Sequence, residues 1–286
     1  MSSVASELHT LQPARLRSFV WPREHGAWGI LLVPLVTGGW IGLFSGRGIS
    51  ALLLFGVASL ALFCLRTPVE IWLETSPLRP QTPTERQAVF YSIVAYASLA
   101  GVALTVLLWR ERAYGLLILG AAVGGLFLAQ AVLKRLGRKT RMTAQLIGSL
   151  GLTSTAAGAY YVITGQFDAR ALILWGANWL FAANQIHFVQ LRIHAARASG
   201  PAVKFARGKG FLASELLAGV VLILAWRADL LPGAALLAFA PIFARGLLWF
   251  FRAPAPLAIH RLGYTELAHA LAFGVLFILG FYLRLL

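Results

Sequence analysis

Stretches of about twenty apolar residues recur along the whole chain, and the gaps between them are alternately rich and poor in Lys and Arg. The chain has 286 residues, 59% of them hydrophobic, and a helix needs about 20 apolar residues to cross a bilayer. Nine such segments are predicted: 26–44, 50–66, 88–108, 114–133, 145–164, 171–191, 210–226, 231–250 and 267–283. This pattern predicts an all-α, polytopic membrane helix bundle of about nine transmembrane helices.

The basic residues predict the orientation of that bundle. Of the 25 Lys and Arg residues, 19 fall before the first segment or after the even-numbered ones, and Arg245 is counted among those after the eighth. Cytoplasmic loops carry the basic excess of membrane proteins. We therefore expect a cytoplasmic N-terminus, a tail over residues 1–20, a single transmembrane domain over 21–286, and a location in the bacterial inner (cytoplasmic) membrane.

Composition excludes several other classes of protein. The formal net charge of +15 would suit a nucleic-acid binder. In a membrane protein, however, the basic excess of the cytoplasmic loops and their contacts with anionic lipids account for such a charge. No nucleic-acid partner is expected. The single cysteine, Cys64, excludes an internal disulfide and any Cys-x-x-Cys metal motif.

The first notable polar cluster follows the second apolar segment, in the run Arg66-Thr-Pro-Val-Glu70-Ile-Trp-Leu-Glu74. If the helix continues through this run, Arg66, Glu70 and Glu74 lie on one face. Two carboxylates one turn apart can share a divalent cation. The alternative is a solvated helix end with an Arg–Glu pair.

The second polar cluster lies at the end of the sixth segment. Asn184 and His187 are one helical turn apart in an otherwise apolar helix. Polar groups at membrane depth usually face a cavity or the bundle interior, so a functional role is predicted, with hydrogen bonding between helices as the alternative.

Three smaller polar features complete the candidates. Glu24 and His25 stand at the cytoplasmic mouth of the first helix, where a helix N-terminus could meet an anion. Glu215 lies inside the seventh segment, where it could pair with Lys209 or with a neighbouring helix. Glu266 and His269 form an i, i+3 pair on the ninth helix.

The opening box Pro22-Arg-Glu-His-Gly-Ala-Trp28, followed by an apolar helix with Pro34, resembles the start of the YwiC-like family of bacterial membrane proteins. The late stretch Arg261-Leu-Gly-Tyr-Thr-Glu266 also resembles that family's C-terminal helix entrance. The activity of the family is not established, so this resemblance implies a class of membrane protein and no reaction.

A weaker resemblance is to the UbiA-type intramembrane prenyltransferases, which have nine helices, an inside N-terminus and acidic motifs at the cytoplasmic ends of the second and sixth helices. Thr67, Glu70 and Glu74 match the three Asp positions of the first motif. Asn184, His187 and Leu191 match those of the second, with Arg192 after them, and the Arg79-Pro80 loop is also similar.

This resemblance implies a UbiA-like helix arrangement and a transferase that acts on an isoprenoid diphosphate or another anionic lipid. It implies Mg²⁺ or another divalent metal on Glu70 and Glu74, and phosphate contacts from the basic residues of the inward side. It implies catalytic or positioning roles for Asn184, His187, Glu24 and His25. The basic residues implied for phosphate contacts are Arg66, Arg79, Arg192 and Lys204.

Glu70 and Glu74 could serve as ligands in the first motif, but where the second motif carries Asp this chain has amide and imidazole groups, so two fully ligated magnesium ions are not expected. Two other functions therefore stay open. One is a transporter or carrier of a small anion, lipid or metal that uses the same cytoplasmic cavity. The other is a non-catalytic membrane protein that binds a lipid.

Overall fold

The computed structural model is built from α-helices and describes residues 15–22, 25–44, 48–76, 78–196, 198, 200–253 and 257–284. Those described residues contain no strand, which confirms the all-α prediction. Within these residues, eight helical segments are long and apolar enough to cross a membrane. The chain divides into two compact units, residues 1–25 with 49–114 and residues 26–48 with 115–286.

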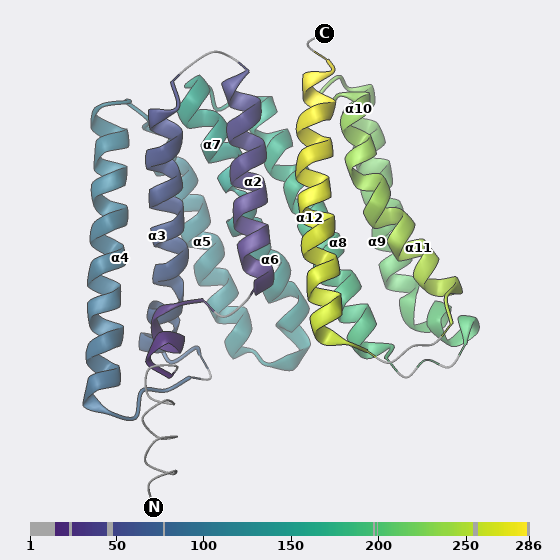
Figure 1. Ribbon diagram of the computed structural model, residues 1–286, viewed down its shortest axis with the longest axis horizontal. Helices are drawn as coiled ribbons and strands as arrows, with labels where there is room; N and C mark the ends of the chain where they lie inside the picture. The colour runs from purple at the N-terminus through teal and green to yellow at the C-terminus, as the bar shows by residue number, and fades with distance from the viewer. Residues whose placement is uncertain are drawn as a thin grey trace, which may run out of the picture. The chain divides into compact units, whose positions relative to one another are not determined.

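The first unit is organised around two long helices, α3 (Ser50–Trp72) and α4 (Pro83–Trp109), which pack side by side (Figure 1). A capping box begins α4: Thr82 Oγ1 accepts from the Glu85 backbone N–H at 3.2 Å, and Glu85 Oε2 accepts from the Thr82 backbone N–H at 3.2 Å. Glu85 Oε1 also lies 2.7 Å from Arg15 Nε. The helical residues 15–20 are thereby fixed to the start of α4, with Phe19 packed against Ile71 and Val89.

The second unit contains the remaining helices. They are α2 (His25–Leu43, from Gly26 on), α5 (Gly115–Arg135), α6 (Arg141–Thr153), α7 (Thr155–Thr164), α8 (Ala169–His194), α9 (Pro201–Arg227), α10 (Gly233–Leu236), α11 (Ala240–Phe251) and α12 (Ile259–Tyr282). Two short 3-10 turns, Arg138–Thr140 and Leu237–Phe239, precede α6 and α11. The pairs α6–α7 and α10–α11 each make one span-length segment.

Helix α8 is the most polar of the span-length helices and falls outside the eight apolar ones. It has 26 residues, so it is about 39 Å long and could cross a bilayer of about 30 Å. Its N-terminus is capped by Asp168, whose carboxylate accepts from the Ala171 backbone N–H at 3.0 Å. With α8 included, the helices match the nine segments predicted from the apolar pattern.

Close packing in the second unit depends on small residues and aromatic rings. A side chain at Gly38 of α2 would overlap the Ala156 carbonyl group of α7, so these two backbones can approach only because Gly38 is glycine. The rings of Phe181 of α8 and Phe273 of α12 stack with centroids 4.1 Å apart. The stacked rings hold α8 and α12 beside each other.

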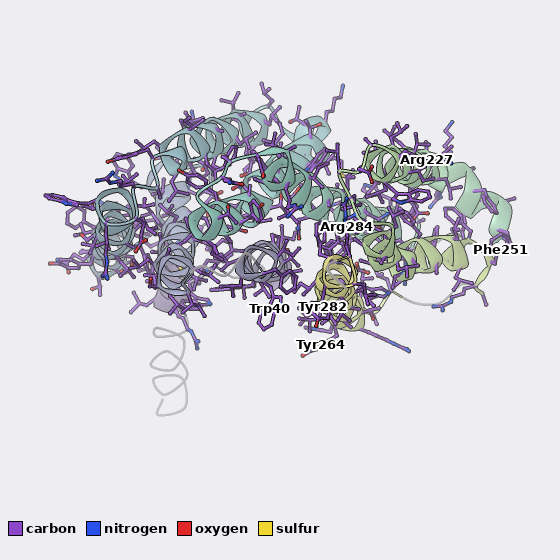
Figure 2. All side chains as sticks on the ribbon, turned by 90° about the horizontal axis from the view of Figure 1, so that it is seen from above. Trp40, Arg227, Phe251, Tyr264, Tyr282 and Arg284 are labelled. Carbon is purple, nitrogen blue, oxygen red and sulfur yellow. The ribbon has the colours of Figure 1, made fainter. Side chains whose placement is uncertain are left out.

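The outer surface of this unit is apolar, as a lipid-facing surface must be. Figure 2 shows Trp40 of α2, Phe251 of α11 and Tyr264 of α12 pointing away from the helices, and they are 53%, 71% and 75% exposed. Two helix ends meet on one side of this unit: Arg284, just after α12, has its Nη2 3.9 Å from Oδ1 of Asp229, just after α9.

Candidate ion-binding site

Four polar side chains from four helices meet inside the second unit. Arg245 of α11 forms a short ion pair with the Glu266 carboxylate of α12, through Nη1 and Oε2. Its other terminal nitrogen, Nη2, donates to Asn184 Oδ1 of α8 at 2.9 Å. The Asn184 amide in turn donates to Glu215 Oε1 of α9 at 3.3 Å. We call these four residues the charged network.

The charged network is buried at membrane depth. The Arg245 and Glu266 side chains are only 8% and 11% exposed, and Asn184 and Glu215 are buried as well. Arg245 lies six residues before the end of α11, which is about 9 Å along the helix. Ionised groups at such positions are costly and usually functional.

Two atoms of the charged network lack partners. Within the described part of the chain, Arg245 Nε and Glu266 Oε1 are buried and make no hydrogen bond. Buried polar atoms are nearly always paired, because an unpaired one loses its hydration without compensation. A free donor and a free acceptor side by side are suited to a polar ligand.

The surroundings hold these groups in place. The Arg245 guanidinium lies over the Phe188 ring, with 4.0 Å from Cζ to the ring centroid, a cation–π contact. Gln185 Nε2 donates to the Glu266 backbone carbonyl at 2.7 Å, which ties α8 to α12. A side chain at Gly246 would overlap the Glu215 carboxylate. The small residue next to Arg245 is therefore what lets Glu215 lie against α11.

His187 makes a separate contact one turn along α8 from Asn184. Its Nδ1 lies 2.9 Å from Ser214 Oγ of α9, and Ser214 Oγ donates to the Phe211 carbonyl at 2.7 Å. Asn184 and His187 thus face the same neighbouring helix, as their spacing predicted. The Ser214 hydroxyl has one proton, which it donates to the Phe211 carbonyl. We therefore interpret His187 Nδ1 as the donor to Ser214 Oγ.

A group of basic side chains lies at the end of these helices. Arg192 is close enough to Glu266, Lys204 and Arg252 to interact electrostatically. Lys204 is buried, and its Nζ donates to the carbonyls of Trp249 at 3.1 Å and Arg252 at 2.6 Å. A lysine on the last carbonyls of a helix stabilises its C-terminus. We interpret Lys204 as a cap on α11, whereas its predicted phosphate contact stays a prediction.

The polar run from Arg66 to Glu74, at the end of α3, differs from its prediction. The helix ends at Trp72, and Glu74 lies beyond it in the left-handed region with φ 55°. Glu70 and Glu74 therefore do not share a helical face, because the last turn closes at Leu73. The predicted Arg66–Glu70 pair is present, with Nε 2.9 Å from Oε1. Arg79 is exposed in the loop that follows.

The structure describes some of the remaining predicted site residues and not others. Glu24 lies outside the described residues, and His25 begins α2 with a side chain outside them. Glu266 contacts Arg245 rather than His269, whose Nδ1 lies 2.7 Å from the Thr265 carbonyl. Over the described residues, no group of three or more His, Cys, Asp or Glu side chains could hold a metal ion. Metal binding by Glu70 and Glu74 stays a prediction.

Arg245 was missed as a site residue because the sequence analysis counted it with the loop after the eighth segment. It lies within α11 instead. The signal was present: Arg245 stands alone in the apolar run from Ile242 to Phe251. A solitary charge inside an apolar helix indicates a buried partner.

One comparison with known proteins gives a match. A family model described as YwiC-like protein matches residues 21–161. No curated protein matches the chain, and neither does any solved structure. The UbiA-type resemblance and the one at residues 261–266 stay predictions, and the charged network lies C-terminal to the matched segment. Over residues 21–161, this membrane protein is therefore similar to the YwiC-like family.

Proposed function

We propose that the protein is a membrane carrier for a small anion, with Arg245 as its binding residue. The observation that supports this most is a guanidinium buried at membrane depth, with one N–H free of any partner in the described part of the chain. Such a charge is retained in a membrane helix at considerable cost, and intramembrane charges typically mark ion or substrate pathways.

The geometry of Arg245 indicates the kind of anion. Both terminal nitrogens already donate, to Glu266 and to Asn184, whereas the Nε–H makes no hydrogen bond among the described residues. A guanidinium binds carboxylate and phosphate oxygens through parallel N–H bonds. Entry from the basic end is favoured, because Arg192 and Arg252 lie there and would attract an anion toward the network.

The carrier fits the contacts better than the transferase does. Transfer from an isoprenoid diphosphate depends on divalent metal held by carboxylates. Glu70 is paired with Arg66, Glu74 lies off the helix, and Asn184 is bonded within the charged network. We therefore favour a carrier, in contact with membrane lipids in the bacterial cytoplasmic membrane.

The test is uptake by proteoliposomes that contain the purified protein. The probes are radiolabelled pyruvate, succinate and phosphate, which represent a monocarboxylate, a dicarboxylate and an inorganic anion. We expect at least one probe to accumulate above the level of protein-free liposomes, and a chelator of divalent metals to leave that uptake unchanged. Uptake equal to that of empty liposomes for all three probes would overturn the proposal.

A further inference from the structure

We infer that one proton moves with each anion and that Glu266 carries it. This inference rests on the carrier function proposed above and concerns its coupling. In the structure, the positive charge of Arg245 is balanced directly by Glu266. An anion that binds Arg245 must take the place of that carboxylate or lie beside it.

Charge balance then requires a proton. A second anion next to an ionised Glu266 would place like charges together in a low-dielectric interior, which favours protonation of one of them. The exchange is balanced as Arg245⁺ with Glu266⁻, plus anion and H⁺, giving Arg245⁺ with the anion and neutral Glu266. Only one O–H bond forms, and it breaks again when the anion and proton leave.

The contacts of Glu266 suit this role. Oε2 holds Arg245, while Oε1 is buried and unpaired among the described residues, so an oxygen is available to take up the proton. A neutral carboxyl group can also donate a hydrogen bond to an anion on Arg245. The ion pair and the free oxygen together allow the two charge states that coupling needs.

The groups around Glu266 favour it over Glu215, the other carboxylate of the charged network, as the proton carrier. Helix α8 brings Arg192 within electrostatic range of Glu266, and the neutral Gln185 amide of the same helix donates to the Glu266 backbone carbonyl. Helix α9 brings Glu215, which lies within electrostatic range of Arg245 and is linked to it by hydrogen bonds through Asn184. Among the described residues, Glu266 is the carboxylate in direct ion-pair contact with Arg245, so an incoming anion competes first with Glu266.

Among the side chains that the structure describes, helix α2 contributes an apolar contact to this part of α12. Gly29 lies against Leu267 and Ala270. Proton exchange is therefore expected from the basic end of the bundle, where Arg192 lies half-buried.

The experiment measures uptake of radiolabelled pyruvate with and without an imposed pH gradient, acid outside, while a trapped dye reports the internal pH. Pyruvate is chosen because it stays ionised and crosses lipid slowly by itself. For the wild type we expect a one-unit gradient to raise the initial rate of uptake and to drive accumulation of pyruvate up to about tenfold, the limit for one coupled proton. Internal acidification should accompany uptake at one proton per pyruvate.

The variant Glu266→Gln resembles the protonated state permanently. Whatever pyruvate uptake this variant retains should no longer respond to the gradient. The matched control is Asp229→Asn, the same chemical change at a carboxylate that is 92% exposed, and it should respond like the wild type. If Glu266→Gln does not fold, the number of protons taken up per pyruvate by the wild type decides whether a proton moves with each anion.

The failures can be told apart. No uptake of pyruvate, succinate or phosphate by the wild type overturns the carrier itself. Uptake that is indifferent to the gradient, or that brings no proton, leaves the carrier in place and overturns the coupling. Loss of coupling in Glu215→Gln with full coupling in Glu266→Gln would also overturn the role of Glu266.

Discussion

The variant Arg245→Gln should lose about 3–5 kcal/mol of folding free energy, because breaking a buried ion pair leaves an uncompensated charge. In this variant Glu266 would remain buried without its cationic partner, and the Asn184 carbonyl would lose a donor at 2.9 Å. The double variant Arg245→Gln with Glu266→Gln removes both charges and leaves a neutral amide at each position. It should recover most of the loss.

The measurement is reversible unfolding in mixed detergent micelles, with the four corners of the double-mutant cycle compared. Such a cycle isolates the coupling between neighbouring residues. Arg227→Gln is the matched control, since Arg227 is exposed at the end of α9 (Figure 2), and its change should be within about 0.5 kcal/mol of zero. A double variant that shows the sum of the two single losses would contradict the pairing.

The variant Lys204→Met should have the next largest effect on stability. Its ammonium donates to two carbonyls at the end of α11 and lies 4.9 Å from the Trp249 ring centroid. Hydrogen bonds that involve a charged group contribute about 1.5–3 kcal/mol each, so a loss of at least about 2 kcal/mol is expected even though methionine fills most of the volume.

The control for this variant lies on the same helix. Lys209 is exposed five residues further along α9, so Lys209→Met should change the free energy of unfolding little. The readout is again unfolding in mixed micelles, together with protease cleavage near the end of α11. If Lys204→Met and Lys209→Met proved equally mild, Lys204 would not be a cap on α11.

The apolar pattern was sufficient to predict the helices because length and hydropathy are local properties. Even α8 was found this way, although Asn184 and Gln185 lower its hydropathy. The Arg66–Glu70 pair could also be predicted, since residues four apart on a helix are neighbours. The end of α3 was harder, because nothing in the run Trp72-Leu73-Glu74 requires the helix to stop there.

The charged network could be predicted only in parts. Asn184 was selected as a polar residue at membrane depth, and Glu215 was noted inside its helix, but the partner of neither follows from spacing along one helix. Arg245 and Glu266 are 21 residues apart on different helices. Their pairing depends on how α11 and α12 pack, which no local pattern encodes.

The most direct test of the account is equilibrium binding of radiolabelled pyruvate, succinate and phosphate to the purified protein in detergent. The variant to compare is Arg245→Gln with Glu266→Gln, which lacks the guanidinium without leaving a buried charge unpaired. We expect saturable binding of at least one probe by the wild type, near one per protein chain, and at least about tenfold weaker binding by the double variant. Equal binding by the two proteins would contradict Arg245 as the anion site.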